Sequence, residues 1–291
     1  MAQRPRAHAL SERIVASSAA LDGAGSVIAK KIRDIMPAGG GVKDVFSGVF
    51  MGHALHPLLT DVPIGAWTSA TILDLVGGES SRPAAQKLVG IGLAAAAPTA
   101  WTGWTDWADT EPGNPTVRRL GLVHAAANGT AALMYGLSLA ARRRGAHTAG
   151  VVFGLAGAGA MGAGGWLGGD LVFARGVGVN QTAFDAEPGD WTAVLDASML
   201  GDDRPTAALA GELALVIVKR NGTIYAMADR CAHRGGPLHE GELEGDCISC
   251  PWHGSLFRLE DGSVERGPSA YPQPVYEARV ADGRVEVRAA G

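Results

Sequence analysis

Four long apolar stretches follow one another through the first part of the chain. They cover approximately residues 55–77, 86–107, 119–141 and 148–174. Each has about the 20 residues that an α-helix needs to cross a bilayer. The second and fourth also lack the charged face that a helix of a soluble bundle presents to water. The pattern predicts an N-terminal four-helix transmembrane bundle, an all-α domain over residues 46–176.

A polar and basic segment precedes the first stretch. Residues 1–45 place apolar side chains at helical spacing and end in PAGGG, which predicts an amphipathic pair of surface helices rather than a secretory signal. Seven Lys or Arg residues lie before the first span. Because loops rich in Lys and Arg stay in the cytoplasm, both termini are expected on that side. The basic joint at Arg142 to Arg144 would then face outward, which counts against this orientation.

The pattern changes after residue 177. A link is expected over residues 177–190, and short alternating segments fill residues 181–291. Two of these segments form hairpin signals, because strand-like residues flank an Asn-Gly pair at Asn221 and an Asp-Gly pair at Asp282. The sequence therefore predicts a multidomain chain in which a small antiparallel all-β domain follows the helices.

Charge and cysteine content narrow the function classes. The net charge is −4, and no basic stripe with interleaved aromatic residues occurs, so nucleic acid is not an expected partner. The chain has 3 cysteines. Cys247 lies where a buried strand residue is expected, which favours a core thiol over a ligand.

The other two cysteines belong to two mixed pairs. Cys231 and His233 form a Cys-x-His pair, and Cys250 and His253 form a Cys-x-x-His pair, with 16 residues between the two pairs. Together they offer two thiolates for one iron and two imidazoles for another, as an asymmetric iron–sulfur cluster requires. Zinc is the alternative metal, although zinc hairpins usually pair Cys with Cys and His with His.

These motifs, CAHRGGPL and CPWHGSLF with the trailing DGSVERGPSA, resemble the Rieske [2Fe-2S] domain of the ferredoxin type. The resemblance covers residues 181–291. It implies that Cys231 and Cys250 hold the inner iron of a [2Fe-2S] cluster, while His233 and His253 hold the outer, more exposed iron. The expected activity is one-electron transfer.

The sequence departs from the cytochrome bc type of Rieske protein around the cluster. Gly236 and Trp252 stand where that type has a disulfide, so no covalent link between the loops is expected. Phe257 stands where that type has a Tyr hydroxyl on a ligand sulfur, while Ser255 remains as a donor to a sulfide. Fewer hydrogen bonds to sulfur predict a midpoint potential near the lower end of the Rieske range, roughly −150 mV.

The apolar half is similar to an uncharacterised bacterial four-helix membrane domain, through HALHPLLTDVPIGAW and GGWLGGDLVFARGVGVN. Ionisable residues within such helices are costly and suggest a functional site. His56 and His124 are the candidates to bind a haem or a quinone, with Asp61 orienting one imidazole. The alternative is structural: these histidines satisfy hydrogen bonds between helices, with Asp61 or Asn128 as the partner of His124.

These features predict a membrane-anchored electron-transfer protein in the bacterial plasma membrane, multi-pass, with the Rieske domain in the cytoplasm. Expected partners are membrane lipid and either a redox protein, a reductase or an oxygenase, or a membrane quinone. The alternatives are the ferredoxin component of a Rieske oxygenase system and a redox-sensing membrane protein. A catalytic oxygenase subunit is not expected, because only 38 residues follow His253. The chain is thus expected to be an oxidoreductase component rather than a stand-alone enzyme.

Overall fold

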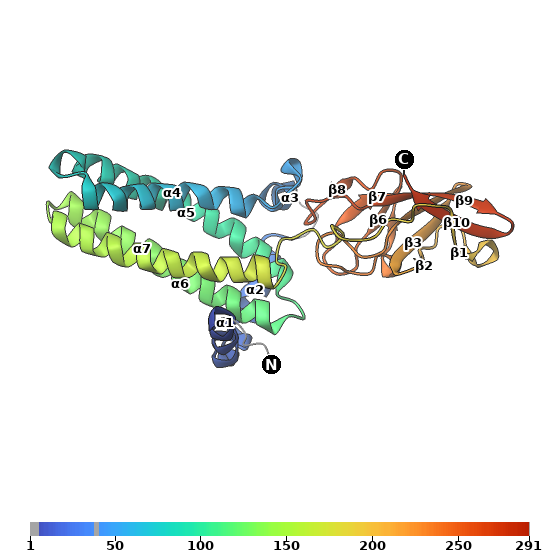
Figure 1. Ribbon diagram of the computed structural model, residues 1–291, viewed down its shortest axis with the longest axis horizontal. Helices are drawn as coiled ribbons and strands as arrows, with labels where there is room; N and C mark the ends of the chain where they lie inside the picture. The colour runs from blue at the N-terminus through green and yellow to red at the C-terminus, as the bar shows by residue number, and fades with distance from the viewer. Residues whose placement is uncertain (1–5, 38–40, 291) are drawn as a thin grey trace. The chain divides into compact units, whose positions relative to one another are not determined.

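The computed structural model describes residues 6–37 and 41–290, which divide into two units (Figure 1). The helical unit combines the chain up to Ile35 with Leu55–Val177. The second unit combines Met36–Ala54 with the chain from Gly178 onward. The polar segment expected over residues 1–45 is therefore shared between the two units.

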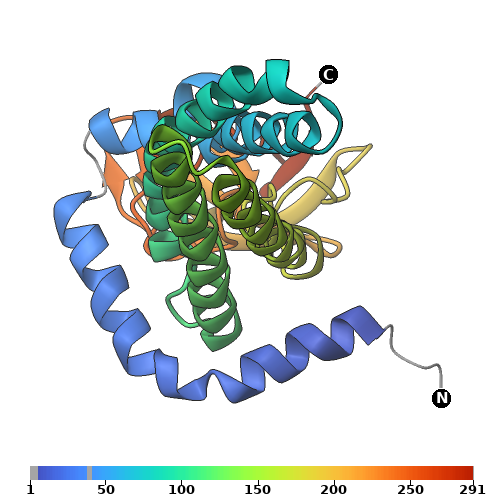
Figure 2. The same cartoon turned by 90° about the vertical axis from the view of Figure 1, so that its left-hand side faces the viewer.

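Each of the four apolar stretches is a helix. The helical unit consists of α1 Arg6–Ser17, η1 Ala19–Leu21, α2 Asp22–Ile35, α4 Leu55–Val76, η3 Glu79–Ser81, α5 Arg82–Thr110, α6 Pro115–Arg143, α7 His147–Gly169 and η4 Asp170–Ala174. Helix α4 packs along α5, and α6 packs along α7, so the four helices form two pairs (Figure 2). The joint before α6 ends one helix and starts the next, because Asn114 caps the backbone N–H of Val117 at 3.1 Å and Pro115 begins the new helix.

The prediction of helices is confirmed, whereas crossing of a membrane by all four is not shown. Among the described helices, His147–Ala174 alone is long and apolar enough to cross a bilayer. The other long helices carry Asp, Lys or Arg at several positions, and these charges lower their mean hydropathy below that of α7.

Arg142, in the last turn of α6, is one of those charges, and it is paired inside the bundle. The guanidinium of Arg142 is buried and donates two hydrogen bonds to the carboxylate of Asp74 on α4 and a third to the hydroxyl of Ser138. The charge of Arg142 is therefore neutralised inside the bundle by this ion pair, and Arg142 is not a free basic charge of the joint.

Ion pairs also fix the N-terminal helices to the helical unit. Arg119 of α6 binds Asp22 at 2.5 Å, and Arg175 binds Glu12 of α1 at 2.8 Å. The segment predicted to be an amphipathic helix pair therefore packs on the ends of the long helices through α1 and α2.

The second unit is antiparallel, as predicted. Its six-stranded sheet has the order β1 Thr192–Asp196, β10 Arg284–Ala289, β9 Val275–Ala281, β4 Thr223–Ala228, β3 Leu213–Arg220 and β2 Thr206–Ala210. Its four-stranded sheet has the order β5 Leu243–Glu244, β6 Cys247–Ser249, β7 Leu256–Arg258 and β8 Val264–Arg266. The short helices are α3 Gly41–Ser47, η2 Val49–Met51, η5 Ala197–Met199 and η6 Leu238–Glu240.

Both predicted hairpins are present. Asn221 and Gly222 join β3 to β4 with φ values of 52° and 80°, the left-handed pair that a tight two-residue turn requires. Strand β3 is apolar on both faces because it separates two cores. Leu215 and Ile217 pack in one core, while Val216 and Val218 pack in the other, which also holds both candidate ligand cysteines.

Candidate iron–sulfur site

Two loops carry the four predicted ligands. The first follows β4 and holds Cys231 and His233. Its shape is set by two backbone hydrogen bonds across it: the Cys231 N–H donates to Gly236 O at 2.9 Å, and the Gly235 N–H donates to Cys231 O at 2.8 Å. Gly235 has a φ of 75°, a value that favours glycine.

The second loop, between β6 and β7, repeats this arrangement. The Cys250 N–H donates to Ser255 O at 2.8 Å, and the Gly254 N–H donates to Cys250 O at 2.9 Å. Gly254 has a φ of 74°, almost the value of Gly235. The two loops therefore present their ligands in matching conformations, which local sequence alone did not reveal.

The ligands separate into a sulfur pair and a nitrogen pair. The Cys231 and Cys250 side chains are buried, and their thiols are hydrogen-bonded to each other. The rings of His233 and His253 lie 5.0 Å apart, centroid to centroid, and meet edge to face. Among the described residues, no three His, Cys, Asp or Glu side chains converge as ligands of a single ion. This geometry disfavours mononuclear zinc and suits a binuclear iron cluster with one iron at each pair.

Backbone N–H groups of each loop favour thiolate, although the hydrogen bond with Cys250 and burial raise the pKa of Cys231 well above its usual value. The pKa of Cys250 is lowered to about 7, chiefly because its sulfur accepts a hydrogen bond from the Cys231 thiol. Hydrogen bonds from the N–H groups of Trp252 and His253 lower it further. N–H groups aimed at sulfur stabilise negative charge there, as they do around iron–sulfur clusters. Burial, the neighbouring His253 and the charges of Arg234 and Lys43 lower the pKa of His233, which keeps its imidazole neutral and able to bind a metal.

Two of the residues predicted to surround the cluster, Gly236 and Trp252, lie beside the candidate ligand Cys250. Gly236 leaves no space for a side chain, because a methyl group there would lie 2.9 Å from Cys250 Sγ and 3.0 Å from the Trp252 ring. All three cysteines are free, so no disulfide joins the loops. Cys247 is buried on β6, as expected of a core thiol.

The hydroxyl of Ser255 is free to act as a donor, as the predicted role requires. It is fully buried and accepts a hydrogen bond from the Ser269 N–H at 2.9 Å, which leaves its own proton to donate elsewhere. Phe257 is also fully buried and packs in the core that contains both ligand cysteines. A hydroxyl at the end of this ring would add a donor near the cluster.

Phe257→Tyr is accordingly expected to raise the midpoint potential of the cluster, because a hydrogen bond to sulfur stabilises the reduced state. A net contribution of about 1 kcal/mol corresponds to roughly 40 mV for one electron. Protein-film voltammetry of both proteins checks this shift. Phe257→Leu, which alters packing without adding a donor, is the control, and an equal rise in that variant would contradict the explanation.

Two polar side chains that sequence reasoning missed hold the first loop: Gln273, which lies far from the motifs, and Asp229, two residues before Cys231. The buried side chain of Gln273 donates to Ala228 O and Arg230 O at 2.7 and 2.8 Å and accepts from the Ala232 N–H at 2.9 Å. Asp229 binds both the backbone N–H and the ring Nδ1 of His239, each at 2.7 Å. The only available signal was the polar residue type within an otherwise apolar region.

The segment before the long helices also contacts this domain. The Gly267 N–H donates to Asp44 of α3 at 2.8 Å, and a methyl group at Gly267 would lie 2.9 Å from the Val49 side chain. Lys43 is near enough to His233 to act on it electrostatically. A positive charge beside the histidine edge favours the reduced cluster.

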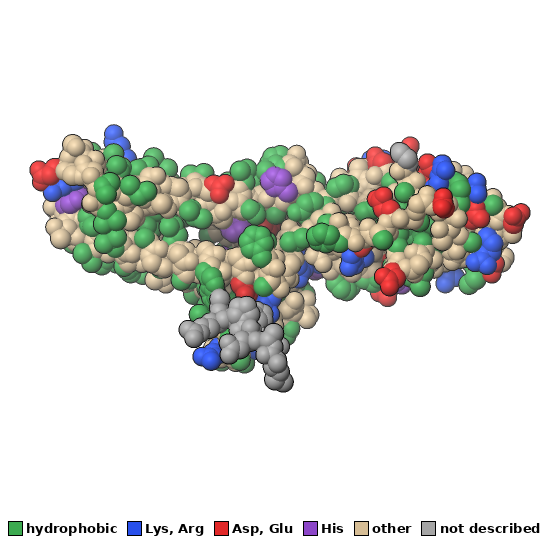
Figure 3. Space-filling view, in the orientation of Figure 1, with side chains coloured by type: hydrophobic (Ala, Val, Ile, Leu, Met, Phe, Trp, Pro, Cys, Tyr) green, Lys and Arg blue, Asp and Glu red, His purple; other side chains and the backbone are tan. Residues whose placement is uncertain are grey.

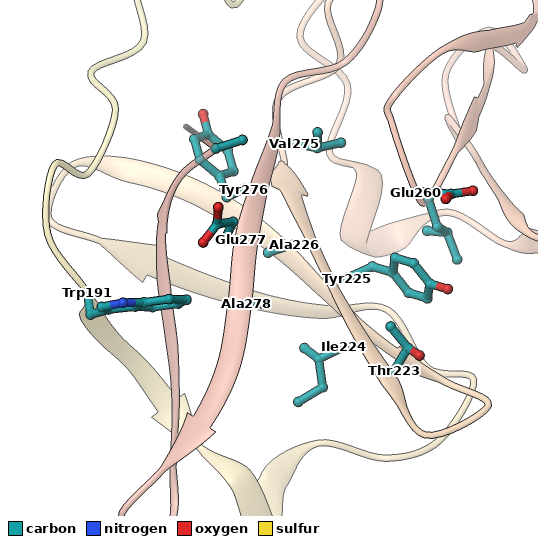
Figure 4. A pocket seen from close by; sticks show the side chains of 12 residues that line it. Trp191, Thr223, Ile224, Tyr225, Ala226, Glu260, Val275, Tyr276, Glu277 and Ala278 are labelled. Carbon is teal, nitrogen blue, oxygen red and sulfur yellow. The ribbon is translucent and has the colours of Figure 1, made fainter.

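A cavity of about 380 Å³ lies elsewhere on the second unit (Figure 4). Its lining includes Trp191, Tyr225 and Tyr276 but no histidine or cysteine. The Arg279 and Arg288 guanidiniums lie 4.0 and 4.6 Å from the centroid of the Trp191 ring. These cation–π contacts stabilise the sheet edge, and none of the lining residues is a candidate ligand of the cluster.

In the helical unit, both histidines of the expected pair are partly buried, and each ring contacts a backbone carbonyl of a neighbouring helix. His56 Nδ1 lies 2.9 Å from Thr99 O, and His124 Nδ1 lies 2.9 Å from Gly164 O. Asp61 is exposed on α4. The carbonyls of Thr99 and Gly164 contact the imidazole Nδ1 atoms in the place expected of Asp61. Asn128 contacts His124, as the structural alternative anticipated.

Two cluster loops mounted on a small antiparallel β domain define an iron–sulfur domain of the Rieske class. The chain belongs to the Rieske [2Fe-2S] family: residues 190–277 match the family model described as Rieske [2Fe-2S] domain. Residues 52–181 match the model described as Predicted membrane protein (DUF2231). The resident cofactor is accordingly a [2Fe-2S] cluster.

Relatives of the second unit include ferredoxins. The anthranilate 1,2-dioxygenase ferredoxin subunit of Burkholderia cepacia is 31% identical over 35% of this chain and 95% of its own length. Ferredoxin CarAc of Metapseudomonas resinovorans is 36% identical over 26% of this chain and 72% of its own. A chain in the solved complex of reduced oxygenase and oxidized ferredoxin in carbazole 1,9a-dioxygenase is 32% identical to this chain. The match covers 34% of this chain and 92% of the solved chain, with a TM-score of 0.32.

Proposed function

We propose that this chain is a membrane-anchored carrier of single electrons, in which α4–α7 hold the Rieske domain at a bacterial plasma membrane. The observation that carries the redox function is the separation of a buried cysteine pair from a histidine pair on matching loops. The cluster supplies reversible one-electron chemistry. The chain's own residues hold it, shield its sulfur side and leave the histidine side as the route for electrons.

Exposed apolar side chains support the membrane anchor. In the most apolar window of α7, 28% of the residues are buried, whereas a core helix of a soluble protein would be mostly buried. Apolar side chains point outward on each of the four long helices: Val62, Ile64, Ile72, Leu75, Val76, Ile91, Leu133, Leu137, Val152, Leu155 and Trp166. Figure 3 shows hydrophobic side chains over much of the surface of this unit. Lipid is the environment in which such a surface is stable.

A cytoplasmic location of the Rieske domain is part of the proposal. Basic residues of the N-terminal segment favour it, and the pairing of Arg142 with Asp74 removes one of the charges that counted against it. Multi-pass insertion follows if all four long helices cross, with their ion pairs kept inside the bundle.

When the full chain is expressed in a bacterium, the cluster should therefore sediment with membranes. It should remain there after an alkaline carbonate wash and be released by detergent, because buried apolar helices resist both salt and high pH. Immunoblotting and EPR of each fraction measure this. Recovery of the folded protein in the soluble or carbonate-released fraction would rule out an integral anchor.

The partner proposed for the cluster is a redox protein, a reductase or an oxygenase, in keeping with the ferredoxin relatives. Trp252 offers a docking point: its side chain is 56% exposed and meets the His253 ring edge to face at 6.4 Å. An exposed tryptophan beside the outer iron ligand is typical of a contact that contributes strongly to binding. A membrane quinone is the alternative acceptor.

Trp252→Ala is expected to slow reduction of the cluster by a flavoprotein ferredoxin reductase about tenfold, the equivalent of about 1.4 kcal/mol at the contact. Oxidation by a soluble quinone analogue should change little, since a small molecule needs no docking surface. Stopped-flow absorbance gives both rates. Leu209→Ala, which truncates another exposed apolar side chain on β2, is the control. Equal rates for wild type and the Trp252 variant with the reductase would contradict the docking role.

A further inference from the structure

The two histidines of the helical unit share one arrangement. His56 on α4 places Nδ1 2.9 Å from the carbonyl of Thr99 on α5. A carbonyl only accepts hydrogen bonds, so the proton is on Nδ1 and the lone pair is on Nε2. The ring fits closely because a methyl group at Gly103 would lie 2.7 Å from His56 Cε1.

The second helix pair repeats this arrangement. His124 on α6 places Nδ1 2.9 Å from the carbonyl of Gly164 on α7, and Gly168 gives the ring room, since a methyl group there would lie 3.2 Å from His124 Cε1. The amide nitrogen of Asn128 lies 3.2 Å from Nε2 and 3.4 Å from Nδ1. Near-equal distances place it over the ring face, away from the in-plane lone pair of Nε2.

Both imidazoles are partly buried and close enough to interact electrostatically. They belong to different helix pairs, and the space-filling view shows open space between those pairs part-way along the unit (Figure 3). Glycines are frequent on α7, the helix that contacts His124. A flat ligand between the helix pairs would therefore meet a helix surface with few large side chains. It would also meet two imidazole nitrogens that can bind a metal.

We propose that the Nε2 atoms of His56 and His124 are the two axial ligands of a haem held between the helix pairs. The choice of haem follows from the number of ligands. An isolated metal ion needs three or four protein ligands, and no group of three His, Cys, Asp or Glu ligands occurs among the residues that the structure describes. Haem iron already has four porphyrin nitrogens and requires only two more ligands. The carbonyls of Thr99 and Gly164 fix the orientation of the two imidazoles. A metal-binding histidine commonly donates its other ring N–H to a carbonyl in this way.

The test uses the full chain in detergent, after expression with a haem precursor and again after titration with hemin. One haem per chain is expected, with the Soret band and the sharp reduced-state visible bands of low-spin iron with two imidazole ligands. His56→Ala and His124→Ala should each reduce bound haem at least tenfold. His53→Ala, which removes an exposed imidazole three positions earlier in the sequence than His56, should keep it.

Three outcomes would overturn the proposal: no stoichiometric haem in either preparation, full haem retention in both histidine variants, or extraction of a bound quinone in place of haem. Misfolding is separated from ligand loss by two measurements. The EPR intensity of the Rieske cluster should be unchanged in both variants, and added imidazole should restore the low-spin spectrum of His56→Gly. Failure of that rescue in a variant with normal size-exclusion behaviour would also count against ligation. The redox role of the Rieske domain does not depend on this result.

Discussion

Cys250→Ser should eliminate the cluster, as should Ala at position 231, 233 or 253. Each ligand holds half of one iron's protein coordination, and no disulfide keeps the two loops together once the cluster is lost. We expect less than about a tenth of the wild-type iron and loss of the reduced-state EPR signal. Iron and sulfide analysis with EPR of dithionite-reduced protein measures both.

Cys247→Ser is the matched control for this result. Cys247 is a buried, free thiol on β6, three residues before a ligand, yet it belongs to the strand and not to the loop. Iron content should persist in this variant, with at most a modest loss of thermal stability. A Cys247 variant without a cluster, or a Cys250 variant with one, would show that the ligands are wrongly assigned.

Asp74→Ala is expected to destabilise the helical unit by about 3–5 kcal/mol, because it leaves the buried guanidinium of Arg142 without a counter-charge. Thermal unfolding in detergent, followed by circular dichroism at a helical wavelength, measures the change. The double variant Asp74→Leu with Arg142→Met should recover much of the loss, since it removes both charges.

The pair formed by Lys30 and Asp34 on α2 provides the control. Its side chains are 73% and 61% exposed, so Asp34→Ala should cost less than about 1 kcal/mol. A similar small cost for Asp74→Ala would mean that Arg142 reaches water in the native state. Recovery of the Rieske EPR signal in every variant would show that the effect is confined to the helical unit.

The sequence predicted features that depend on neighbouring residues. The proposed cluster ligands lie within two short motifs, the hairpin turns depend on Asn221 and Asp282 with the glycine after each, and the long helices follow from local hydropathy. These signals need no knowledge of tertiary structure.

The features that sequence did not reveal depend on distant pairs. Gln273 supports a loop 41 residues earlier, and Asp44 binds a backbone N–H 223 residues later. The ion pair of Arg142 with Asp74 joins a residue of the basic joint to a residue of α4 that lies 68 positions earlier. Asp61 was the expected partner of an imidazole, but helix carbonyls accept a hydrogen bond from Nδ1 of each ring without it. Side-chain type alone cannot identify such partners.

EPR of the purified full chain, recorded as isolated and after dithionite, tests the central assignment most directly. A binuclear cluster with cysteines on one iron and histidines on the other should be silent when oxidised and give a rhombic signal of about one spin per chain when reduced, with two irons and two sulfides by analysis. One zinc per chain, with no signal after reduction, would contradict the assignment of this site.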